Sequence, residues 1–92
     1  MIKSFRHKGL EAFYRIGSKA GINPQHFTRL NAQLSALDVA KISDDMNFPG
    51  WCLHPLTHNF ASYWSVTVNG NWRMIFSFDG EDAILVDYID YH

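Results

Sequence analysis

The sequence predicts a single α+β domain over residues 1–92, in which two helices pack on a curved, mainly antiparallel sheet in the order β-α-α-β-β-β-β. Apolar residues follow a helical period through the first 40 positions, and strand-like alternation begins only after residue 50. Two hairpin signals divide the second half into strands. Ninety-two residues allow one hydrophobic core and no second domain.

The first helical pattern follows a short strand candidate at residues 2–6 and runs from His7 to about Ile16, where Gly17 is expected to end it. The second begins at Asn23, a favourable N-cap, with Pro24 at the first helical position, and ends near residue 40. Its apolar face is formed by Phe27, Leu30, Leu34 and Leu37. A loop rich in turn formers follows over residues 43–50.

The second half contains four strand candidates, at residues 51–56, 63–68, 72–78 and 83–91. Asn69-Gly70 and Asp79-Gly80 predict hairpins, the first of type I′, because these dipeptides tolerate positive φ. If the second loop has two residues, Arg73 lies opposite Val86 and shares a face with Asp90. A loop of three residues would reverse this, so the facing stays open.

The charge of the chain is divided unevenly. Residues 1–41 contain seven Lys/Arg against two acids, and residues 42–92 contain Arg73 alone against seven acids, so the net charges are +5 and −6. The basic part is suited to hold phosphates, and Lys3, Arg6, Lys8 and Lys19 are its candidate RNA- or ribosome-binding residues. The alternative is an ordinary solvated surface.

Cysteine usage and the N-terminal sequence bear on the compartment. Cys52 cannot form an internal disulfide and is expected to be a small buried residue. Charged residues interrupt the N-terminus where a signal peptide needs an apolar stretch, and no segment approaches membrane-spanning length. We therefore expect a cytoplasmic protein without membrane association.

Five polar residues form the candidate catalytic site: His54, Arg73, Asp90, Tyr91 and His92. Cleavage of RNA by the ribose 2′-hydroxyl needs a base, a cation at the phosphoryl oxygens and an acid for the leaving 5′-oxygen. Asp or His can serve as base and His or Tyr as acid, and an arginine matches the phosphate as a fork. Each residue also has a purely structural alternative, such as an ion pair between Arg73 and Asp90.

Across nearly its whole length the sequence resembles the HigB-type toxins of the RelE/ParE superfamily. The resemblance is carried by Met1 to Phe5, Leu53-His54-Pro55-Leu56, Tyr63 to Val68, Asn71-Trp72-Arg73 and Asp90-Tyr91-His92. It implies a RelE-like fold and an mRNA endoribonuclease that cuts in the A site of the 30S subunit, without a metal or other cofactor. It also implies a helix-turn-helix antitoxin of the HigA type as partner, through which alone the toxin meets DNA.

The resemblance implies that the same five residues form the active site. Asp90 or His54 would be the base, Arg73 would hold the scissile phosphate, and His92 with Tyr91 would donate a proton or position the base. Relatives often carry basic residues where this chain has Thr57 to Phe60 and Asn69-Gly70. Their absence predicts a weaker grip on phosphates and lower salt sensitivity of RNA binding.

Two other readings remain. His54, His58, Asp90 and His92 are potential zinc ligands, although no Cys pair or helical His-x-x-x-His pattern accompanies them. The chain could also be a non-catalytic module that binds the antitoxin and takes part in autoregulation of its operon. Substitution of Arg73 or His92 would then leave the growth of a host that expresses the protein unaffected, which distinguishes this alternative from a catalytic toxin.

Overall fold

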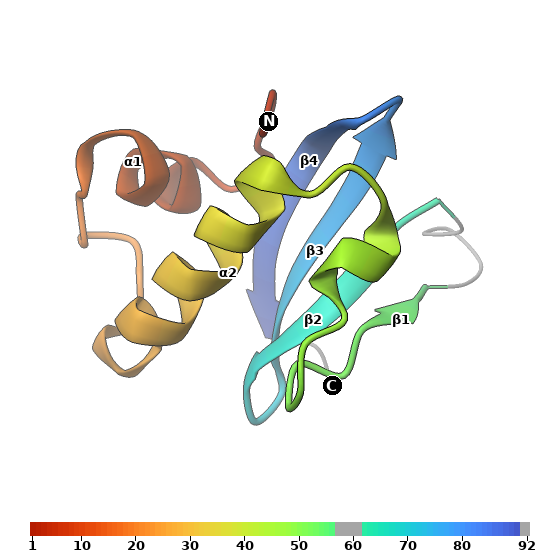
Figure 1. Ribbon diagram of the computed structural model, residues 1–92. Helices are drawn as coiled ribbons and strands as arrows, with labels where there is room; N and C mark the ends of the chain where they lie inside the picture. The colour runs from red at the N-terminus through yellow and green to blue at the C-terminus, as the bar shows by residue number, and fades with distance from the viewer. Residues whose placement is uncertain (57–61, 91–92) are drawn as a thin grey trace.

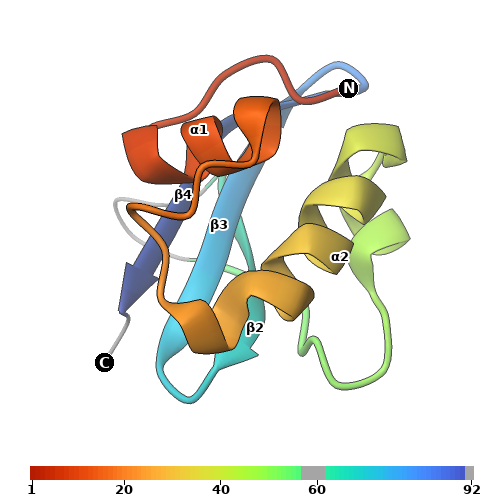
Figure 2. The same cartoon turned by 90° about the vertical axis from the view of Figure 1, so that its left-hand side faces the viewer.

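A computed structural model describes residues 1–56 and 62–90 of the chain. Two helices lie against one face of a four-stranded antiparallel sheet with the strand order β1-β2-β3-β4 (Figure 1). Turned by 90°, the molecule shows both helices in front of the sheet (Figure 2). The predicted α+β class, with two helices packed on a mainly antiparallel sheet, is confirmed. No helix in the described part is long and apolar enough to cross a membrane.

The first helix, α1, spans Lys8–Ile16 and begins where predicted. The side chain of His7 caps it, since its Nδ1 accepts a hydrogen bond from the Leu10 amide at 2.9 Å. The helix ends at Gly17, whose φ of 73° is the left-handed conformation that glycine tolerates. The expected stop signal is therefore confirmed.

The second helical region begins with a 3₁₀ turn, η1 (Pro24–His26), and continues as α2 (Phe27–Val39). Asn23 caps the turn, because its Oδ1 accepts the Gln25 amide at 3.0 Å. The start and end agree with the prediction, but the first turn is tighter than an α-helix. The loop that follows contains a second 3₁₀ turn, η2 (Ser43–Met46), which the turn-forming residues did not indicate.

The strands are β1 (His54–Pro55), β2 (Trp64–Asn69), β3 (Trp72–Asp79) and β4 (Asp82–Asp90). The strand predicted at residues 51–56 contains only two residues, because the φ of 51° at Cys52 is incompatible with a regular strand. Asn69 pairs with Trp72, so Gly70 and Asn71 are the central residues of the turn. Gly70 has a φ of 56°, but Asn71 is not at positive φ, so the turn is not of type I′.

The N-terminal segment lies alongside β4 in parallel, through isolated bridges of Ile2 with Ala83 and of Phe5 with Val86. Between these bridges the Oγ of Ser4 accepts the Leu85 amide at 2.9 Å. The predicted strand at residues 2–6 is therefore reduced to two bridges. The reason is a bulge in β4, at which the regular ladder is interrupted.

The bulge in β4 determines which candidate site residues lie on the same face of the sheet. The register between β3 and β4 shifts by one residue between Ile75 and Ser77, and Leu85 on β4 has a φ of 56°. Asp79 pairs with Asp82, so the two loop residues are Gly80 and Glu81 and the pairing moves by two residues from the predicted one; the bulge adds a third, so Arg73 pairs with Ile89 and not with Val86. Because a shift of one residue exchanges the two faces of a strand, the bulge decides what shares a face with Arg73.

The core lies between the helices and the sheet. It is formed by Leu10 of α1, the Leu30, Leu34 and Leu37 stripe of α2, and sheet residues that include Val66, Met74, Phe76 and Val86. A buried histidine completes it: the Nδ1 of His26 lies 2.5 Å from the Tyr88 hydroxyl. Trp72 stacks on Tyr88 with ring centroids 4.6 Å apart. This aromatic cluster supports the end of the sheet at which Arg73 and Asp90 lie.

Candidate functional site

The sheet face turned away from the helices brings together two of the five predicted catalytic residues. His54 pairs with Ser65 across β1 and β2, and Arg73 pairs with Thr67 across β2 and β3. Paired residues, and residues two apart on one strand, share a face, so all four lie on this outer face. Two strand spacings and one two-residue step separate the Cα atoms of His54 and Arg73 by roughly 12 Å.

His54 is exposed, and both of its ring nitrogens have an oxygen neighbour. Its Nδ1 lies 3.0 Å from the carbonyl oxygen of Cys52, and its Nε2 lies 3.3 Å from the Oγ of Ser65. The short strand β1 positions the ring, because its pairing with β2 ties the backbone of His54 to that of Ser65. An imidazole held in this way can accept or donate a proton at the protein surface.

Arg73 is held by the hairpin that precedes it. Its Nη1 donates to the carbonyl oxygens of Gly70, at 2.6 Å, and Trp72, at 3.1 Å. Its Nε is buried and has no hydrogen-bond partner among the described residues. Because two carbonyl oxygens anchor Nη1, the guanidinium is held in one orientation, and a charged donor held in this way is suited to bind an anionic oxygen.

Asp90 lies on the opposite face of the sheet from Arg73. It pairs with Trp72, is exposed, and ends β4. The shared face that the two-residue loop predicted for Arg73 and Asp90 is therefore wrong, and the bulge at Leu85 is the physical reason. Tyr91, His92 and His58 lie outside the described residues.

The candidate RNA-binding residues lie apart from His54. Lys3, Arg6, Lys8 and Lys19 are all exposed. Lys3 and Arg6 belong to the segment beside β4, whereas His54 is on β1 at the opposite edge of the sheet. Lys19 lies over the ring of Phe27, 5.0 Å from its centroid. The basic surface and the candidate catalytic face are therefore separate features of the molecule.

Cys52 is exposed, not buried as expected, because its strained backbone turns the chain sharply before β1. The metal alternative can be judged only in part. Within residues 1–56 and 62–90, no three His, Cys, Asp or Glu side chains lie close enough to hold a metal ion. Two of its four proposed ligands are outside that range.

Sequence reasoning missed Ser65. It lies between Trp64 and Val66 in a strand pattern, which gives a buried serine no distinguishing signal. Only the register with β1 shows that its hydroxyl faces His54.

Residues 3–92 match the family model described as the RelE-like toxin of type II toxin-antitoxin system HigB. The chain belongs to the HigB-like toxin family. It is 42% identical, over the full length of both proteins, to a protein of Proteus vulgaris named Endoribonuclease HigB. The predicted family is confirmed, and a HigB-like toxin of a type II system has an antitoxin as its partner.

Proposed function

We propose that this HigB-like toxin is an endoribonuclease that cuts mRNA in the ribosomal A site. The observation that supports this best is the state of Arg73, whose guanidinium is anchored through Nη1 to the carbonyl oxygens of Gly70 and Trp72. A fixed guanidinium at the scissile phosphate stabilises the negative charge that grows during attack of the 2′-hydroxyl. The relative from Proteus vulgaris, named an endoribonuclease, supports the same activity.

His54 on the same face supplies the group that exchanges a proton with the RNA. Asp90, which ends β4 on the opposite face of the sheet, and Tyr91 and His92, which follow it in the sequence, are the other proposed catalytic residues. A separation of roughly 12 Å between the Cα atoms of His54 and Arg73 requires an RNA backbone held in one conformation. The ribosome provides such a substrate, and free RNA is expected to be cut poorly.

The antitoxin is proposed to be a helix-turn-helix protein of the HigA type, which carries the DNA binding of the complex. In the described part of the toxin, α2 is the longest helix, and its apolar stripe is buried in the core. Arg29 is the only Lys or Arg of α2, so this helix does not offer a basic face to a DNA groove. We place the activity in the cytoplasm, where translation occurs.

The test is induced expression of the toxin without antitoxin, followed by growth measurement and mapping of mRNA 5′ ends. We expect growth arrest with cuts in the reading frame. Arg73→Ala should reduce cleavage by about 100-fold or more, as loss of a donor to a transition-state oxyanion does. Arg73→Lys should restore only part, because an ammonium lacks the fork.

Arg29→Ala is the matched control, since it removes one arginine from α2 and leaves the outer face unchanged. Arrest in all three variants would exclude Arg73 from the reaction. Absence of arrest by a well-expressed wild type would favour the non-catalytic, antitoxin-binding alternative. Efficient cutting of naked RNA at the same concentration would contradict the dependence on the ribosome.

A further inference from the structure

Thr67 lies between His54 and Arg73 on the outer face of the sheet. It pairs with Arg73 across β2 and β3, and it is two residues from Ser65, which pairs with His54. Thr67 is half-buried, whereas Ser65 and Ile75 on the same face are buried. An RNA backbone that contacts both His54 and Arg73 therefore passes over the side chain of Thr67.

The backbone of Thr67 is held from the side opposite to β3. Its amide donates to the carbonyl oxygen of Trp51 at 2.7 Å, and its carbonyl oxygen accepts from the Nε2 of Gln33 at 2.8 Å. Because both groups point away from β3, Thr67 and Arg73 form a non-hydrogen-bonded pair. In such a pair the Cα atoms are about 4.5 Å apart and the side chains approach most closely.

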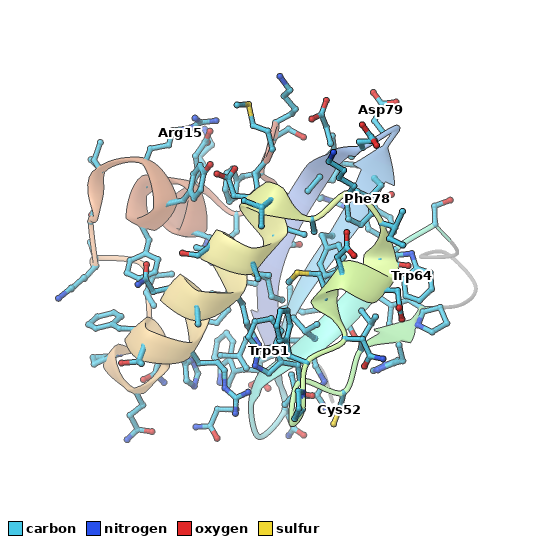
Figure 3. All side chains as sticks on the ribbon, viewed as in Figure 1. Arg15, Trp51, Cys52, Trp64, Phe78 and Asp79 are labelled. Carbon is cyan, nitrogen blue, oxygen red and sulfur yellow. The ribbon has the colours of Figure 1, made fainter. Side chains whose placement is uncertain are left out.

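These two hydrogen bonds replace a missing part of the sheet. β1 contains only two residues, so its pairing with β2 ends at Ser65 and leaves the edge of β2 open at Thr67. Trp51 lies on the segment that leads to β1 (Figure 3), and the fully buried Gln33 reaches this edge from α2. With its backbone fixed on both sides and a β-branched side chain that is stiff at χ1, Thr67 holds its hydroxyl in a defined place.

Arg73 needs a second donor beside it to bind a phosphate completely. Its Nη1, which carries only two N–H groups, is engaged by the carbonyl oxygens of Gly70 and Trp72, and its Nε is buried. Nη2 is therefore the nitrogen that can reach a phosphate oxygen. A phosphodiester has two non-bridging oxygens that share its negative charge, so one of them requires a donor from another residue.

Thr67 is the hydroxyl residue that pairs with Arg73. Two other hydroxyls of the outer face already have protein partners: Ser65 lies 3.3 Å from the Nε2 of His54, and Ser77 donates to the carbonyl oxygen of Ser62 at 2.8 Å. Both of these serines are also buried. Thr67 is thus the hydroxyl of this face that is both accessible and adjacent to the guanidinium.

We propose that the Oγ1 hydroxyl of Thr67 donates a hydrogen bond to one non-bridging oxygen of the scissile phosphate, while Arg73 binds the other. This assignment rests on the proposed endoribonuclease function. The hydroxyl transfers no proton; it stabilises the negative charge that grows on its oxygen as the ribose attacks phosphorus. Thr67 contacts the substrate, and Gln33 and Trp51 position it through its backbone.

The first test is cleavage of mRNA on purified ribosomes by Thr67→Val, which exchanges the hydroxyl for a methyl group and keeps the branched shape that strands favour. Loss of a hydrogen bond to a charged oxygen should lower kcat/KM by about 10- to 100-fold. Thr67→Ser, which keeps the hydroxyl, should cut several times faster than Thr67→Val. Thr28→Val makes the same exchange at an exposed position of α2 and should cut like the wild type.

The decisive measurement replaces the oxygen that Thr67 binds. An mRNA with a single phosphorothioate at the scissile position exists as two diastereomers, which place sulfur, a weak hydrogen-bond acceptor, at one non-bridging oxygen or the other. In the wild type and in Thr28→Val, one diastereomer should be cut more slowly than the normal mRNA, by the factor that Thr67→Val loses. In Thr67→Val, the same sulfur should cause no further loss.

Two outcomes would overturn the proposal: normal cleavage by Thr67→Val, or slow cleavage with unchanged effects of both sulfur substitutions. If the wild type cuts no mRNA, the proposed function fails, and the contact is measured by binding to ribosomes that carry an uncleavable mRNA with a 2′-deoxy scissile ribose. Weaker binding by Thr67→Val than by Thr28→Val would then uphold the contact, and equal binding would refute it.

Discussion

At the scale of single residues, the hydrogen bond between His26 and Tyr88 connects stability to pH. Both side chains are buried, and burial lowers the pKa of His26 and raises the pKa of Tyr88. Below the ordinary value of 6.5, an unfolded chain takes up a proton at His26 that the folded chain resists, so stability falls as the pH falls. Above the ordinary value of 10.0, the unfolded chain loses the Tyr88 proton first, and stability falls again.

We therefore expect the free energy of unfolding in urea to decrease between pH 8 and pH 5. His26→Phe should lower it at pH 8 by about 1–3 kcal/mol, because the Tyr88 hydroxyl loses a buried partner. The same change should flatten the dependence below pH 6.5. His54→Gln, which replaces an exposed histidine, should keep the wild-type slope. An equally steep slope in His26→Phe would show that another group titrates.

At the scale of the elements, local sequence signals predicted the helices and hairpins but not the bulge. Asn23, Pro24 and Gly17 impose backbone conformations on their own, so the helix ends could be located from the sequence. Leu85 is an ordinary strand residue, and its positive φ is imposed by tertiary pairing on both sides. For this reason the candidate site residues could be named from the sequence, but which of them share a face of the sheet could not be predicted.

The contact between Ser4 and the bulge can be tested directly. Ser4→Ala removes the acceptor of the Leu85 amide, which should cost about 1 kcal/mol and lower Tm by about 4–8 °C in a domain of this size. Ser35→Ala, at an exposed position of α2, should change Tm only slightly. An unchanged Tm in Ser4→Ala would mean that water replaces the hydroxyl.

At the scale of the whole molecule, charge and chemistry lie at opposite edges of the sheet. The basic residues of the N-terminal segment lie beside β4, and His54 is on β1. A toxin that holds ribosomal RNA through the β4 edge would leave its outer face turned to the mRNA. In that arrangement residues 1–41, with a net charge of +5, supply the affinity for RNA. Residues 42–92, with a net charge of −6, add little to this affinity beyond the contribution of Arg73.

Charge reversal separates these roles. Lys3→Glu combined with Lys8→Glu should abolish co-sedimentation with ribosomes while antitoxin binding persists, because phosphate contacts dominate RNA affinity. Arg29→Glu with Lys41→Glu changes the net charge equally outside the candidate surface and is the control. Ribosome binding that resists the first pair at physiological salt would rule out the N-terminal segment as the contact.

The pairing of the N-terminal segment with β4 also bears on when the toxin becomes active. Ser4 and Leu85 are 81 positions apart, so the amide of one and the hydroxyl of the other meet only after almost the entire chain has been synthesised. Contacts so distant in sequence form late in folding. On the ribosome that makes this protein, the nascent sheet therefore keeps an open edge until β4 has emerged.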